Sequence, residues 1–203
     1  MTALSLAFLL ALAGVGTPAR NARPKASETP ATTTTTEDLP AAEVANRVRA
    51  YLGAIDTPIP AARWRALGPR AVAPLEAVVR DPEALPSRRS KAVDALSVVG
   101  GERARELVLE TARSEREPFG VRASALRGAS RLLATKDLVK ELRPVLEGAR
   151  DPTVRATAAE VLARHAGPSS CRAVRAQAAR EGGDVRGRFT PALVRCGNVA
   201  PGR

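Results

Sequence analysis

Residues 151–162 read DPTVRATAAEVL, and they contain the pattern that decides the fold. Within this stretch an arginine is followed at three-residue steps by an alanine and then by a small or apolar pair. The same arrangement occurs at a constant period of 33 residues, in Arg89-x-x-Ala92-x-x-Ala95-Leu96, Arg122-x-x-Ala125-x-x-Gly128-Ala129 and Arg155-x-x-Ala158-x-x-Val161-Leu162. A looser copy, Arg186-x-x-Phe189-x-x-Ala192-Leu193, follows 31 residues later. A fixed period of this length is typical of solenoids, whose stacked helical units build an extended binding surface rather than a catalytic cleft.

The segments between the copies carry apolar residues at helical spacing, so each repeat is predicted to be a pair of antiparallel helices. The second helices are expected to begin near Ser87, Gly120, Thr153 and Asp184. In two of the first helices a proline stands seven residues before an Asp-Pro pair: Pro74 before Asp81-Pro82, and Pro144 before Asp151-Pro152. A proline inside a helix removes a hydrogen bond and bends the helix, and the residue before a proline is pushed out of the α conformation. We therefore expect curved first helices that end in tight turns.

These motifs resemble HEAT repeats in the short bacterial form of about thirty residues. The match is best at Asp151-Pro152-Thr153-Val154-Arg155-x-x-Ala158 and is partly kept at Pro118-Phe119-Gly120-Val121-Arg122-x-x-Ala125. The copy at Arg88-Arg89 lacks the valine, and the last copy has Phe189 in place of alanine and Pro191 within its helix. The resemblance covers Leu67 to about Cys196. It implies an all-α fold, a right-handed α-solenoid of about 4–5 antiparallel helix pairs.

The two ends of the repeat domain, which is predicted over residues 41–197, are expected to be atypical helix pairs that cap the stack. At the N-terminal end these are Ala41 to Ile55, with an apolar face, and Ile59 to Leu67, which contains the only tryptophan, Trp64. At the C-terminal end they are Ser169 to Glu181 and Val185 to Cys196.

The first forty residues are expected to lie outside the fold. Ala3 to Val15 is a continuous run of apolar or small residues, too short to span a bilayer, and it predicts a signal peptide over residues 1–19. No basic residue precedes the run, although signal peptides usually have one there. A buried N-terminal helix and a misplaced start codon are therefore kept as alternatives to a signal peptide. Residues 20–40 contain several prolines and the run Thr32 to Thr36, which predicts a disordered linker, and residues 198–203 are predicted to be a disordered tail.

The chain has two cysteines, Cys171 and Cys196. In an exported protein an even number of cysteines suggests a disulfide. On the chain-entropy model, closing a loop of this size would stabilise the fold by about 3 kcal/mol. Two free thiols in a cytosolic protein are the alternative if the signal peptide is wrong. With one histidine and no CxxC motif, too few ligands remain for zinc.

Adding the period aligns charged residues of neighbouring second helices, and the resemblance implies that these helices line the concave, partner-binding surface. Asp94, Arg127 and Glu160 become equivalent, which favours an ion-pair ladder. Arg131, Arg164 and Arg195 form a second column, which could bind carboxylates or phosphates. The alternative is a plain solvated face, because 28 arginines against 4 lysines indicate a chain-wide bias. The candidate partner-binding residues are Lys91, Asp94, Arg127, Arg131, Glu160, Arg164 and Arg195. The recurring Arg89, Arg122, Arg155 and Arg186 are instead expected to tie adjacent repeats together.

A net charge of +11 in 203 residues raises affinity for nucleic acid or anionic polymers, and eight arginines follow from Arg164 onward. The exported start disfavours DNA as a partner. Motif searches find no G-x-S-x-G, H-E-x-x-H, P-loop or G-x-G-x-x-G, and the only histidine, His165, stands at a helix end. The sequence thus predicts no catalytic residue, cofactor or metal.

The function predicted is a non-catalytic scaffold that binds another protein, with an acidic protein as one candidate, in the periplasm or after secretion, and with no transmembrane span in the mature chain. This inference rests on the fold. Two alternatives stay open: a basic solenoid that binds nucleic acid or an anionic surface polymer, and a HEAT-like lyase or glycosylase, which is the weaker of the two.

Overall fold

The computed structural model describes residues 39–54 and 57–197, and all the regular structure in these ranges is helical. The predicted signal peptide, nearly all of the predicted linker and the predicted tail lie outside the described residues. Leu39, near the end of the predicted linker, is buried, and its carbonyl accepts a hydrogen bond of 2.8 Å from Arg70.

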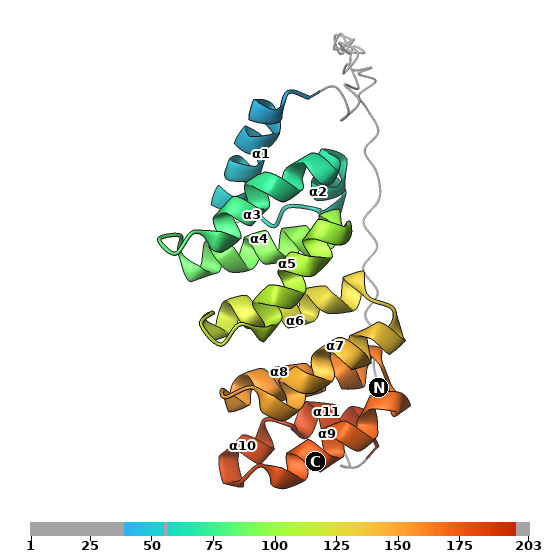
Figure 1. The fold of residues 1–203 in the computed structure, drawn as a ribbon. Coiled ribbons are helices and arrows are strands. Elements are labelled where there is room, and N and C mark those ends of the chain that lie inside the picture. Colours follow the sequence, from blue (N-terminus) through green and yellow to red (C-terminus); the bar gives the residue numbers. More distant parts are fainter. Residues whose placement is uncertain (1–38, 55–56, 198–203) are drawn as a thin grey trace, which may run out of the picture. The chain divides into compact units, whose positions relative to one another are not determined.

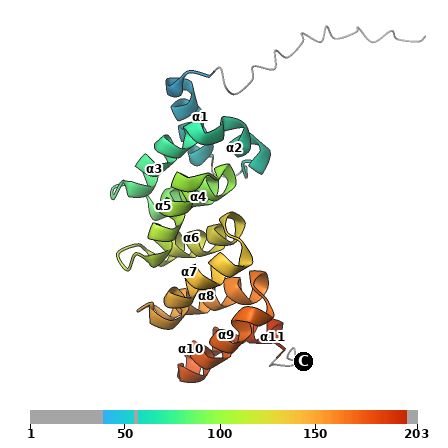
Figure 2. The same ribbon diagram turned by 45° about the vertical axis from the view of Figure 1, so that its right-hand side comes forward.

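The helices follow one another in chain order from α1 to α11 (Figures 1 and 2). Their bounds are α1 Ala41–Gly53, α2 Ala61–Leu67, the 3₁₀ turn η2 Gly68–Ala71, α3 Val72–Arg80, α4 Pro86–Val99, α5 Glu102–Arg113, α6 Phe119–Leu132, α7 Thr135–Gly148, α8 Pro152–His165, α9 Pro168–Arg180, α10 Gly183–Gly187 and α11 Thr190–Arg195. The sequence placed the starts of α4, α6 and α8 to within one residue.

Two rows of helices pack against each other. In one row α2 contacts α4, α4 contacts α6, α6 contacts α8, and α8 contacts α11. In the other row α3 contacts α5, α5 contacts α7, and α7 contacts α9. The arginine motifs of the repeat lie in α4, α6 and α8, so the charged columns predicted from the period lie on helices that are direct neighbours.

The core between the rows consists of leucines and many alanines. Leucines such as Leu75, Leu96, Leu107 and Leu126 are fully buried, and the alanines of the repeat motif lie among them. Small side chains let helix axes approach closely, so stability comes from many small contacts along the stack.

The turns between the helices use proline and glycine where the backbone requires them. Asp151 caps α8 by accepting a 2.7 Å hydrogen bond from the backbone N–H of Thr153, and Pro152 takes the first helical position, where no N–H partner is needed. Gly100 and Gly101, at φ 77° and 89°, allow the short turn from α4 to α5.

Two local expectations were wrong. Pro144 lies inside α7, but Pro74 stands in the first turn of α3, where a proline costs no hydrogen bond. The single helix expected over 185–196 is divided into α10 and α11, because Pro191 cannot donate a backbone hydrogen bond to Gly187. The division leaves Phe189 fully buried between the two short helices.

Cys171, in α9, and Cys196, directly after α11, form the predicted disulfide, with their Cα atoms 5.5 Å apart. The bond joins the last long helix to the end of the last short one. Arg175, one turn further along α9, donates a 2.5 Å hydrogen bond to the carbonyl of Cys196.

Gly128 marks the closest approach of α4 and α6. A Cβ at this position would lie 3.0 Å from Cβ of Ser97 and 3.5 Å from Cγ1 of Val108. We expect Gly128→Val to lower the free energy of unfolding by about 1–3 kcal/mol, since the added methyl groups overpack this contact. Urea unfolding measures the effect. Gly148→Val is the control, because nothing lies within 4 Å of a Cβ there; equal losses in the two variants would contradict the close approach.

Candidate functional site

The predicted partner-binding residues are distributed over four helices of one row. Lys91 and Asp94 lie in α4, Arg127 and Arg131 in α6, Glu160 and Arg164 in α8, and Arg195 in α11. The structure brings all of them except Arg195 into the lining of two cavities, of about 540 and 370 Å³. Arg127 and Arg131 line both cavities. We call the larger one the anchor cavity, the smaller one the basic cavity, and the two together the charged groove.

The anchor cavity lies where α4 meets the N-terminal helix pair. Its apolar wall contains Trp64 and Tyr51, whose rings pack edge to face with centroids 5.2 Å apart. Ile59 and Val98 extend this wall. Lys91 stands at the rim and donates a 2.7 Å hydrogen bond to the carbonyl of Ala54.

Asp94 lies between the two cavities and is the acidic residue of the anchor cavity lining. Its carboxylate accepts a 3.3 Å hydrogen bond from the Ser124 hydroxyl and lies 3.7 Å from Nη1 of Arg131. Burial raises the pKa of Asp94, while the positive charges of Arg127 and Arg131 oppose that change. Arg131 also donates to the Ser97 hydroxyl at 2.8 Å. The Asp94 carboxylate therefore offsets only part of the positive charge around it.

The basic cavity is formed by α6 and α8 and contains two residues of the arginine column, Arg131 and Arg164. Arg164 is paired with Glu160 on its own helix, at 2.5 Å. The pKa of His165 is lowered by burial and then by the positive charges of Arg164, Arg131 and Arg195. The three arginines predicted to align thus act on one imidazole from α8, α6 and α11.

The ion-pair ladder predicted for Asp94, Arg127 and Glu160 does not form, because none of the three is ion-paired with another. Asp94 pairs with Arg131, Glu160 pairs with Arg164, and Arg127 donates to the Ser124 hydroxyl at 3.1 Å. Among the described residues, Arg127 has no carboxylate within ion-pair distance. The groove therefore keeps cations whose charge is not neutralised.

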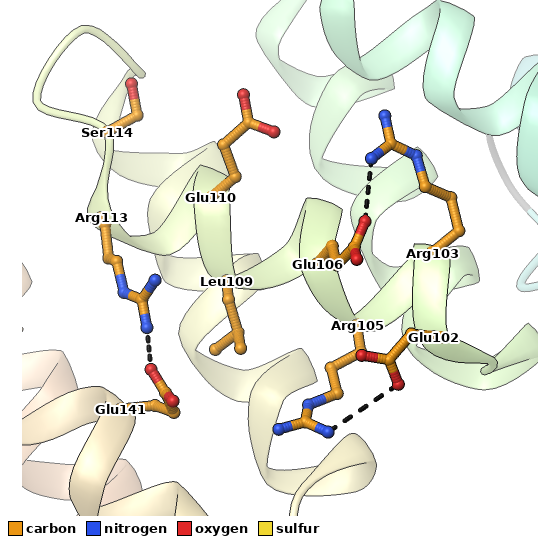
Figure 3. Close-up of a pocket in the computed structure, with 9 residues that line it drawn as sticks. All are labelled: Glu102, Arg103, Arg105, Glu106, Leu109, Glu110, Arg113, Ser114 and Glu141. Carbon is orange, nitrogen blue, oxygen red and sulfur yellow. Dashed lines mark hydrogen bonds and ion pairs between the residues drawn. The ribbon is translucent and has the colours of Figure 1, made fainter.

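The inter-helix ion pairs lie mainly on the other row. Glu76 of α3 pairs with Arg103 of α5, Arg80 pairs with Glu110 at 2.8 Å, and Arg113 of α5 pairs with Glu141 of α7. Four of these side chains line a cavity of about 710 Å³ together with Leu109, as Figure 3 shows: Arg103, Glu110, Arg113 and Glu141. Hydrogen bonds from Arg103 and Arg80 lower the pKa of Glu76. Because opposite charges are already matched here, this surface is a weaker candidate for a charged partner.

The recurring arginines act as structural ties, as predicted, in two of the four copies. Arg89 donates to the carbonyl of Val79 at 2.8 Å and to Glu117 of the next repeat at 2.7 Å. Arg155 similarly binds the carbonyl of Ala149 and Glu181 of the next repeat, each at 2.6 Å. Arg122 stays within its own repeat, and the exposed Arg186 forms no such hydrogen bond within residues 57–197.

Sequence reasoning missed the aromatic wall of the groove. Tyr51 and Trp64, the only tyrosine and tryptophan of the chain, come from the N-terminal pair, which has no place in the repeat register. Their rarity is the one sequence signal that could have identified them.

Further features bear on the class of function. Over the described ranges, no group of three or more His, Cys, Asp or Glu side chains is placed to hold a metal ion. Among the helices in these ranges, none has the length and apolar character needed to cross a membrane. Comparison of the chain with protein-family models, with curated proteins and with solved structures found no match.

Proposed function

We propose that residues 41–197 form a HEAT-like right-handed solenoid of antiparallel helix pairs that acts as a non-catalytic, protein-binding scaffold. The arginine motif recurs at a fixed period within the chain, and α4, α6 and α8 contact one another in succession. Both observations support the solenoid. In such a stack each unit contacts only its neighbours and the surface is extended, which suits a long partner segment better than a small substrate.

The observation that carries the binding proposal is the charged groove. Two cavities share Arg127 and Arg131, and their cations exceed their carboxylates. A groove with an excess of arginine favours a partner that brings carboxylates, since arginine forms forked hydrogen bonds with them. The partner is therefore another protein with an acidic segment.

The proposed site of action is the periplasm or the exterior of the cell. A cysteine pair at disulfide distance is consistent with an oxidising compartment, where such bonds persist. Together with the apolar run near the N-terminus, this favours export before the scaffold meets its partner.

The test is affinity capture from a nuclease-treated envelope extract with three forms of the full chain. The groove form carries Arg131→Gln, Arg164→Gln and Arg195→Gln. The matched control carries Arg103→Gln, Arg113→Gln and Arg143→Gln, the same change in net charge on α5 and α7 of the other row. We expect a protein captured by the wild type and the control but lost from the groove form. The same set of proteins on all three forms would refute the proposal.

A further inference from the structure

The charged groove is chemically different at its two ends. The anchor cavity presents the rings of Trp64 and Tyr51 with Ile59, whereas the basic cavity is lined mostly by polar and charged side chains such as Arg131, Arg164 and His165. A uniformly acidic polymer would leave the aromatic wall unused. Aromatic side chains in a concave site usually accept one apolar group, because they bury a large area with few rotatable bonds.

The basic end has unpaired capacity for carboxylates. Glu160 neutralises Arg164, and Asp94 lies 3.7 Å from Arg131, but Arg127 and Arg195 have no ion pair among the described residues. Arg127, Arg131 and Arg164 all line the basic cavity, so their like charges are close together there. A ligand with two adjacent carboxylates would supply the missing negative charge.

The distance between the two ends sets the spacing of the ligand. The aromatic wall stands on α1 and α2, whereas Arg127 and Arg131 stand on α6, and α4 packs between α2 and α6, so two interhelical steps separate the helices that carry the two parts. Packed helices are about 8–10 Å apart, which gives about 16–20 Å. An extended chain rises about 3.3 Å per residue, so five or six residues cover that distance.

We propose that the charged groove binds an extended peptide segment in which one apolar side chain, seated against Trp64 and Tyr51, stands five or six residues from a pair of acidic residues held by Arg127 and Arg131. This inference rests on the proposed function, and it adds the chemistry and the spacing of the partner segment. The apolar residue fixes where the peptide sits in the groove. The carboxylates distinguish this peptide from other segments that also carry an apolar residue.

Trp64 makes the proposal directly measurable, because it is the only tryptophan of the chain and lines the anchor cavity. The experiment titrates synthetic peptides without tryptophan into the oxidised full chain and records Trp64 emission. The parent peptide has one leucine, a Gly/Ser spacer that places the first glutamate about six residues away, and two glutamates. We expect a saturable change in emission.

Three altered peptides and one variant test the parts separately. The first altered peptide has both glutamates replaced by glutamine, the second has leucine replaced by alanine, and the third has a spacer of half the length. Each change should weaken binding about tenfold or more, since a charge-assisted hydrogen bond or a seated leucine contributes about that factor to the affinity. Arg127→Gln/Arg131→Gln should weaken the parent peptide similarly, while Arg113→Gln/Arg143→Gln should not. Circular dichroism checks that each variant folds.

Certain outcomes overturn the inference. These are unchanged emission, equal affinity for the glutamine and glutamate peptides, or displacement of the peptide by oligo-dT of equal charge regardless of the leucine. If the groove form loses a protein that the wild type captures from the envelope extract, but no peptide binds, this inference is overturned and the proposed function stands. If the groove form captures the same proteins as the wild type, the proposed function is overturned as well.

Discussion

Replacing Arg122 with methionine is expected to lower the free energy of unfolding by about 2 kcal/mol, because a hydrogen bond to a charged group contributes about 1.5–3 kcal/mol. The Arg122 side chain is only 3% exposed, and Arg122 is the only charged residue in the part of the chain described here that is buried. Its guanidinium forms a fork to Glu115, at 2.9 and 3.0 Å, and Nε donates to the carbonyl of Ala112 at 3.3 Å. Methionine fills similar space but removes the donor to the Ala112 carbonyl and the fork to Glu115, which keeps a backbone hydrogen bond from Arg150.

The pH dependence separates this ion pair from a packing effect. The hydrogen bond from Arg122 lowers the pKa of Glu115 below its ordinary value of 4.5. A carboxyl with a lowered pKa contributes stability above its ordinary pKa, and this contribution is lost as the pH falls through the lowered value. The gap in stability between the wild type and Arg122→Met, measured by urea unfolding, should therefore narrow as the pH falls below about 4.5. A gap that stays constant would contradict the ion pair.

The exposed neighbour Arg116 provides the control. Arg116→Met removes the same charge from the same turn, at the residue directly after Glu115, without a buried contact. We expect its stability to change by less than about 0.5 kcal/mol, as is usual for surface substitutions. A loss equal to that of Arg122→Met would mean that net charge, rather than the buried fork, determines the result.

The repeat made part of the fold predictable from sequence. The Arg-x-x-Ala pattern and the Asp-Pro turn are local signals, and they placed the starts of α4, α6 and α8 correctly. The same period predicted that Arg131, Arg164 and Arg195 lie near one another; Arg131 and Arg164 line the same cavity, whereas Arg195 lines neither cavity of the charged groove. Periodicity fixes which residues are equivalent, and equivalent residues on neighbouring helices are close in a stack.

Contacts that depend on side-chain direction or on departures from the repeat were not predictable. Arg131 reaches Ser97 and Asp94 on the preceding helix, and Glu160 turns back to Arg164 on its own helix. Sequence spacing alone cannot choose between these partners, since a long side chain reaches three or four residues in either direction. The aromatic wall comes from α1 and α2, which do not follow the period, and the full burial of Phe189 follows from the division of the last helix at Pro191.

The C-terminal end of the stack is where the disulfide is expected to matter most. Cys171→Ser/Cys196→Ser should lower the free energy of unfolding by about 3 kcal/mol, because the bond closes a loop over a sequence separation of 25 residues. The last helices have repeat neighbours on one side only: α9 contacts α7 and α8, and α11 contacts α8. Terminal units of a stack have the fewest interfaces, so a covalent link there opposes local unfolding that the core cannot prevent.

The loss should therefore be local, and limited trypsin digestion can locate it. Between α9 and α11 the chain offers cleavage sites at Arg172, Arg175, Arg180, Arg186, Arg188 and Arg195. We expect the double variant, and the wild type in reductant, to be cut first in this segment, whereas sites in α4 to α8 stay protected. Reductant should not accelerate cleavage of the double variant further, which makes that variant its own control. Two results would contradict this prediction: equal digestion of the oxidised and reduced wild type, or first cuts within α4 to α8. Either result would show that the packing of the last helices against α8 already holds the end of the stack, and that the disulfide adds no stability there.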